Sequence, residues 1–202
     1  MKLRAILFMI GASCVCAVSN GSSLSHSTDA DPLLYGQAIV GLGTPYGLTG
    51  AGLAFNPMPW VGIEAGAGIG ASTGSVQFAL VPYLRIPINS VFAAGLGAGL
   101  SEGAYKDNQP LVVEGKYPAA NWDHALWFDT EVFSEVRLKK FRLKGSLGIA
   151  KILNGSDGKC TVYGWNNEKT VTPCDSYSAN STHNDALKWH PYVGFTAGYQ
   201  IF

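Results

Sequence analysis

Apolar and polar residues alternate along most of the chain from residue 33 onward. In a β-strand, successive side chains face opposite sides, whereas a helix repeats its apolar positions every three to four residues. The alternation therefore predicts β-strands rather than helices. Eight are expected, over 33–43, 48–56, 60–70, 76–87, 90–101, 121–138, 141–152 and 189–202.

Each expected strand carries one apolar face. In the range 76–87, for example, Phe78, Leu80 and Leu84 alternate with polar or smaller residues. Pro82 stands inside this strand and cannot donate a backbone hydrogen bond, so we expect a bulge or a local break there.

The connections between the expected strands differ in length. Those after the second, fourth and sixth strands are short, and the long polar segments 103–120 and 153–187 follow the fifth and seventh. Outer-membrane barrels have short turns on one side and long loops on the other, and their strands of about 9–11 residues exceed the average soluble strand. The pattern predicts an all-β fold, an eight-stranded antiparallel up-and-down transmembrane β-barrel, over 33–202.

The composition agrees with a membrane location. Only 14% of the 202 residues are charged, against about 25% in ordinary soluble domains, and no apolar run reaches the roughly 18 residues of a spanning helix. Lys and Arg total 14, as do Asp and Glu, so no basic excess points to a nucleic-acid partner.

The N-terminal segment has the features of an export signal. Lys2 and Arg4 precede an apolar run that ends at Val18, and small residues follow. We expect residues 1–19 to be removed and 20–32 to form a flexible leader. A lipid-modified Cys14 is an alternative. Loss of Lys2 and Arg4 leaves 12 basic against 14 acidic residues, a net charge of −2.

Two cysteines, Cys160 and Cys174, remain after the expected cleavage. In an exported protein such a pair predicts a disulfide that closes a loop, although two free thiols are also compatible with the sequence. Tyr163, Trp165 and Tyr177 surround this expected bridge. They are candidates for exposed binding elements, or for packing within the loop.

Charged residues occupy the polar faces of the expected strands. If Lys139 and Lys140 form a two-residue turn, Glu135 lies opposite Lys144, Arg137 opposite Arg142, and Glu131 opposite Gly148, where a side chain such as Arg85 would fit. These charges form either an ion-pair network that plugs the lumen or a polar track for small solutes. The full candidate set is Glu64, Arg85, Asp129, Glu131, Glu135, Arg137, Arg142 and Lys144.

Glycine and aromatic residues complete the expected barrel. The chain has 25 glycines, and those on some walls leave room in the lumen for Tyr83, Arg85, Trp127 and Phe133 from others. Aromatic rings near strand ends suggest interfacial girdles, or alternatively ordinary core packing. They are Phe55, Trp60 and Phe141 at the periplasmic rim and Trp122, Trp189 and Tyr192 at the outer rim.

The last residues are Gly198-Tyr199-Gln200-Ile201-Phe202. With the export signal and the strand pattern, they make the chain similar to the small eight-stranded outer-membrane barrels typified by the OmpA membrane domain, OmpX and OmpW. The resemblance implies the outer membrane of a diderm bacterium as location. It also implies outer-membrane lipid and the barrel assembly machinery as partners, with Phe202 as an assembly signal.

Four kinds of function are compatible with the sequence. We expect a non-enzymatic surface protein whose loops 103–120 and 153–187 contact an extracellular ligand, without cofactor or metal. The alternatives are a narrow channel, a lipid-modifying enzyme, and a secreted soluble β-sandwich. For an enzyme or a metal site, the candidates are Ser181, His183, Asp185 and His190.

Overall fold

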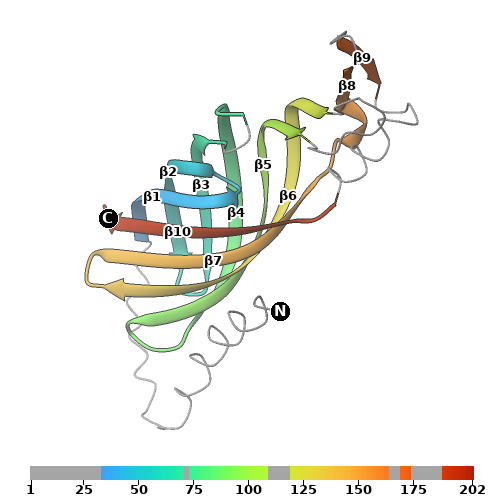
Figure 1. Ribbon diagram of the computed structural model, residues 1–202. Helices are drawn as coiled ribbons and strands as arrows, with labels where there is room; N and C mark the ends of the chain where they lie inside the picture. Colours follow the sequence, from blue (N-terminus) through green and yellow to red (C-terminus); the bar gives the residue numbers. More distant parts are fainter. Residues whose placement is uncertain (1–32, 71–72, 109–118, 164–168, 174–187) are drawn as a thin grey trace, which may run out of the picture.

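The structure, a computed structural model, describes residues 33–70, 73–108, 119–163, 169–173 and 188–202 (Figure 1). The described part contains ten strands and one short 3₁₀ helix, η1 (Gly155–Asp157). The strands are β1 (Leu33–Thr44), β2 (Gly47–Met58), β3 (Val61–Ile69), β4 (Val76–Pro87), β5 (Phe92–Asn108), β6 (Ala119–Leu138), β7 (Phe141–Ile152), β8 (Lys159–Tyr163), β9 (Lys169–Pro173) and β10 (His190–Gln200).

Eight of these strands close into an antiparallel up-and-down barrel. Strands β1 to β7 pair in sequence order, and β10 lies between β7 and β1. The predicted fold class is therefore confirmed, and a two-sheet sandwich is wrong because the β5–β6 pairing closes the sheet. The β8–β9 hairpin joins the sheet through β6, and Figure 1 shows it projecting from one end of the barrel.

Most strand boundaries agree with the alternation, and the differences lie at the end that carries the long connections. β5 continues to Asn108 and β6 begins at Ala119, so part of the expected loop 103–120 is strand. The expected loop 153–187 contains η1, β8 and β9. In these segments the paired residues are largely polar. Because neither side of such a strand needs to be apolar, the sequence shows no alternation that would reveal it.

The expected break at Pro82 is wrong. β4 pairs with β3 in one register throughout, with Pro82 opposite Ile63. On the other side, Leu80 pairs with Leu100 and Tyr83 with Gly97, so the ladder passes the proline without a shift. One missing donor is accommodated locally because the neighbouring rungs stay in place.

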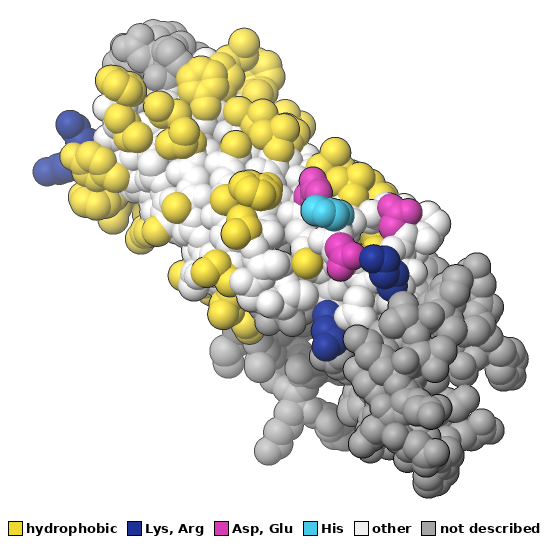
Figure 2. Space-filling view, turned by 90° about the horizontal axis from the view of Figure 1, so that it is seen from above, with side chains coloured by type: hydrophobic (Ala, Val, Ile, Leu, Met, Phe, Trp, Pro, Cys, Tyr) yellow, Lys and Arg dark blue, Asp and Glu magenta, His cyan; other side chains and the backbone are white. Residues whose placement is uncertain are grey.

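The outer wall of the barrel is apolar. Phe78, Leu84 and Phe195 are each about 60% exposed, at 60%, 58% and 61%. Figure 2 shows hydrophobic side chains spread over the wall, Asp, Glu and His side chains gathered toward one end, and Lys or Arg side chains near both ends. Such a continuous apolar exterior requires lipid rather than water around it. The described part of the chain contains no helix that is long and apolar enough to cross a membrane.

Large side chains fill the interior over glycines of neighbouring strands. The ring of Tyr83 lies against Gly62, the ring of Phe133 against Gly95, and the Glu131 side chain against Gly97. The expectation that glycine leaves room for Tyr83 and Phe133 is confirmed. The lumen is consequently a packed core in this region.

We call the end of the barrel that carries the long connections the outer end. A bulge there reverses which side chains of β6 point into the lumen. Gly103 pairs with Ala125 but Tyr105 pairs with Trp122, so β6 carries one extra residue between these rungs. Trp122 therefore turns inward and is buried. The expected place of Trp122 and of the buried Tyr192 in an outer girdle is wrong, whereas Trp189 is exposed at this rim.

Candidate functional site

The candidate site is a layer of charged side chains in the half of the lumen near the β6–β7 turn. The expected register of that hairpin is confirmed: Glu135 pairs with Lys144, Arg137 with Arg142, and Glu131 with Gly148. Lys139 adopts a φ of 55° in the turn. Because alternate residues share a face, this register aims the charges of both strands into the lumen.

Glu135 is the acceptor shared by three arginines. Its Oε1 accepts from Arg85 Nε at 3.0 Å and from Arg137 Nε, and its Oε2 accepts from Arg142 Nε at 2.7 Å. The Glu135 and Arg142 side chains are fully buried. A carboxylate with several charged donors is the arrangement that makes burial of its charge tolerable.

Glu64 extends this cluster across the barrel from β3. Its Oε1 accepts from Arg142 Nη2 at 2.9 Å, and its Oε2 accepts from Lys144 Nζ at 2.9 Å. Lys144 also donates to Glu131 Oε1 at 2.6 Å. A continuous chain of ion pairs thus links β3, β4, β6 and β7. We call it the charged plug: Glu64, Arg85, Glu131, Glu135, Arg137, Arg142 and Lys144.

Aromatic rings and an amide support the charged plug. The Lys144 ammonium lies 4.7 Å from the centre of the Phe133 ring, and the Arg142 guanidinium lies 5.4 Å from that of Tyr83. The Tyr83 hydroxyl and the Asn56 side-chain amide are hydrogen-bonded, with Tyr83 Oη 3.0 Å from Asn56 Oδ1. The cations are therefore held by ring faces as well as by carboxylates.

Two candidate residues differ from their expected places. Arg85 binds Glu135 instead of Glu131, because Lys144 already occupies Glu131 and the ring of Tyr192 covers Gly148. Asp129 is buried but lies outside the charged plug. Its Oδ2 accepts no hydrogen bond from a described residue.

Asp129 belongs to a second group of buried polar side chains. The side-chain polar atoms of Gln37 and the hydroxyls of Tyr46 and Tyr192 also have no hydrogen-bond partner within the described residues. All of them are nearly inaccessible to solvent. The sequence pattern placed Asp129 with the other charges because parity gives the face of a residue but not its partners.

Packed rings occupy the outer end of the lumen. Tyr105 and Trp127 pack edge to face with ring centres 4.9 Å apart, and His190 lies 5.4 Å from Trp127 and 5.7 Å from Tyr105. Buried Trp122 and Cys160 belong to the same hydrophobic cluster. The barrel interior is thus occupied at both ends.

Beyond the apolar wall, the outer end carries an exposed ion pair and an exposed histidine–carboxylate contact. Lys159 Nζ lies 2.8 Å from Asp123 Oδ2, and His124 Nδ1 lies 3.1 Å from Glu102 Oε1. The hydrogen bond from Lys159 lowers the pKa of the Asp123 carboxyl. Asn154 anchors the segment after β7, since its amide accepts from Leu126 N and donates to the His124 carbonyl.

Several expected site residues lie outside the described residues or have no described side chain. Cys174, Trp165 and Tyr177 fall outside them, so the Cys160–Cys174 bond stays a prediction; Tyr163 is the last residue of β8. Phe202 is exposed, and its carbonyl accepts a hydrogen bond from Leu34 N at 3.2 Å.

The enzyme and metal candidates are not brought together in the described residues. Ser181, His183 and Asp185 lie outside them, and His190 packs among rings. Over the described ranges, no group of three His, Cys, Asp or Glu residues is placed to hold a metal ion.

Sequence reasoning missed the residues that support the charges. Asn56 and Tyr83 bind one another 27 positions apart in the sequence, and Tyr35 lies below the Arg137 guanidinium at 5.4 Å. Their inward parity was visible, but which rings meet which cations depends on barrel closure. The alternation carries no information on that closure.

Comparison with known proteins identifies solved structures with a similar fold. No protein-family model and no curated protein sequence matches the chain. Among solved structures, a major outer membrane protein from Thermus thermophilus superposes with a TM-score of 0.51 at 13% identity, over 84% of this chain and 99% of that one. Acinetobacter baumannii CarO gives 0.41 at 17% identity, over 84% and 97%. The chain has the fold of a small eight-stranded outer-membrane barrel.

Proposed function

We propose that the chain is an integral outer-membrane protein whose barrel is closed to solutes and whose contacts are made by its outer end. The apolar wall supports the membrane location, together with the fold shared with the Thermus outer membrane protein. The expected export signal and assembly terminus Phe202 are consistent with delivery to that membrane.

The charged plug is the observation that carries the closed lumen. Glu64, Glu135 and Arg142 are each at most 1% exposed. Their ion pairs cross the lumen from β3 to β6 and β7, and rings fill the space beside them. A path for hydrated solutes requires room that these side chains occupy.

The outer end supports a role in surface contact. β5 and β6 continue beyond the apolar wall, where β6 pairs with the β8–β9 hairpin, and loops carry a large share of binding residues in proteins. We assign the contact surface to 153–187, with Tyr163, Trp165 and Tyr177 as candidate anchors. Trypsin applied to intact cells should cleave at Lys159 or Lys169 and leave the Lys139-Lys140 turn uncut.

Planar-bilayer conductance of the refolded protein tests the closed lumen. We expect no stable openings from the native sequence, and openings from the charge-balanced double variant Glu135→Ser/Arg142→Ser. Stable openings of the native protein would favour the second candidate, a narrow channel. The feature that supports this second candidate is the set of buried polar atoms, Asp129 Oδ2 among them, that have no hydrogen-bond partner in the described part of the chain.

A further inference from the structure

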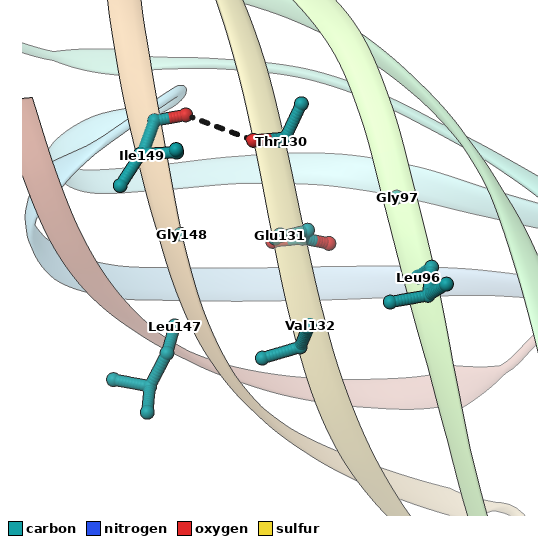
Figure 3. A pocket seen from close by; sticks show the side chains of 8 residues that line it. All are labelled: Leu96, Gly97, Thr130, Glu131, Val132, Leu147, Gly148 and Ile149. Atoms are coloured by element: carbon teal, nitrogen blue, oxygen red, sulfur yellow. Dashed lines mark hydrogen bonds between the residues drawn. The ribbon is translucent and has the colours of Figure 1, made fainter. Parts of the chain in front are cut away.

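A groove of about 520 Å³ lies on the outer wall of the barrel where β5, β6 and β7 run side by side (Figure 3). Leu96, Val132, Leu147 and Ile149 line it with exposed apolar side chains. We call it the lipid-side groove. Figure 3 shows these side chains standing around the backbone of Gly148 and Glu131.

The groove exists because one row of the wall carries short side chains on two of its three strands, β5 and β6. Leu96, Val132 and Leu147 form one cross-strand row, and Ala98, Thr130 and Ile149 form the next. Ala98 and Thr130 are short, so the wall is lower between the bulkier neighbours. Thr130 Oγ1 donates to the Ile149 carbonyl at 3.4 Å, which directs the hydroxyl toward the backbone and leaves the groove apolar (Figure 3).

The following row, toward the outer end, contains a cation. It consists of Leu100, Phe128 and Lys151. Lys151 is exposed on the same face of β7 as Leu147 and Ile149, and its Nζ lies 5.7 Å from the centre of the Trp189 ring. A lysine on an apolar wall extends its ammonium to the headgroup level, and tryptophan favours that same level.

We propose that the lipid-side groove and Lys151 form a binding site for a phosphorylated, acylated glycolipid of the outer leaflet. An acyl chain lies in the groove, and a headgroup phosphate binds the Lys151 ammonium beside Trp189. Ile149 and Lys151 are two positions apart on one face, about 7 Å along the strand. One lipid molecule therefore reaches both.

The position of Lys151 identifies the leaflet. β7 starts at the short Lys139-Lys140 turn and reaches Lys151 just before the long connection, so Lys151 lies at the outer end. This assignment rests on the proposed outer-membrane location. It does not depend on whether the lumen conducts, and conductance therefore tests the proposed closure separately.

Native mass spectrometry of the refolded protein tests the site with bisphosphorylated lipid A and with the same glycolipid lacking phosphates. We expect Lys151→Gln to weaken binding of the phosphorylated form about fivefold, the effect of one lysine at an anionic membrane surface. Binding of the phosphate-free form should be unchanged. Lys139→Gln at the opposite turn is the matched control and should leave both affinities unchanged.

A second variant tests the acyl-chain half of the site. Thr130→Leu adds bulk to the low row and should weaken binding of both glycolipids, while thermal unfolding checks that the barrel is intact. The proposal is overturned if Lys151→Gln matches Lys139→Gln, or if Thr130→Leu binds both glycolipids like the native protein. It is also overturned if phosphatidylglycerol binds as tightly as lipid A and shows the same dependence on Lys151.

Discussion

The ring of Tyr83 lies directly over Gly62, its cross-strand partner on β3. A Cβ atom at Gly62 would overlap the Tyr83 ring. The ring cannot move away freely, because its hydroxyl is hydrogen-bonded to Asn56 and its face lies against Arg142. Glycine at this position thus sets the place of a ring that supports the charged plug.

Gly62→Ala should therefore destabilise the barrel. We expect the free energy of unfolding to fall by about 1–3 kcal/mol, the usual cost of overpacking a filled core. Urea unfolding in lipid vesicles, followed by tryptophan fluorescence, measures it. Gly145→Ala is the control, because a Cβ there would meet its nearest atom, on Phe195, at an ordinary 3.7 Å. An equal effect of both variants would contradict the role of Tyr83.

Glu135→Gln should be more damaging than its small change in shape suggests. It removes the negative charge shared by Arg85, Arg137 and Arg142. Breaking a buried ion pair by neutralising one partner costs about 3–5 kcal/mol of unfolding free energy. The same urea experiment measures it. Glu102→Gln, in the exposed pair with His124, should cost at most about 1 kcal/mol; equal losses in the two variants would refute the plug's contribution.

Asn154→Ala should loosen the outer end without unfolding the barrel. Asn154 Oδ1 accepts from Leu126 N at 2.8 Å, and Nδ2 donates to the His124 carbonyl at 2.6 Å. Loss of such an exposed bond costs about 0.5–1.5 kcal/mol, so exchange of the Leu126 amide should accelerate by about two- to tenfold. Hydrogen exchange with mass spectrometry measures this. Ser156→Ala is the control, and an unchanged rate at Leu126 in Asn154→Ala would contradict the anchoring role.

Counting the free thiols tests the predicted Cys160–Cys174 bond. The exported protein, unfolded without reductant, should take up no thiol reagent, whereas reduction should expose both cysteines. Cys160→Ser should then show a free thiol at Cys174 even without reductant. Labelling of both cysteines in the unfolded, unreduced protein of native sequence would show that they are free.

Sequence alternation alone predicted the residues of the barrel wall and the β6–β7 register, because a single lipid-facing side fixes which alternate residues of each strand point outward. It failed where that constraint ends. Trp122 turned inward because of a bulge that polar residues do not reveal. Arg85 met Glu135 because partner choice depends on closure of the sheet.

The length of β6 has a consequence for how far the β8–β9 hairpin lies from the membrane. Twenty residues, Ala119–Leu138, extend about 65 Å as a strand, or about 45 Å in height at a tilt near 45°. An apolar band of about 25 Å accounts for only part of that height. The β8–β9 hairpin, joined to the far end of β6, therefore lies on the order of 20 Å beyond the apolar band. At that elevation a folded macromolecule can touch it without approaching the membrane.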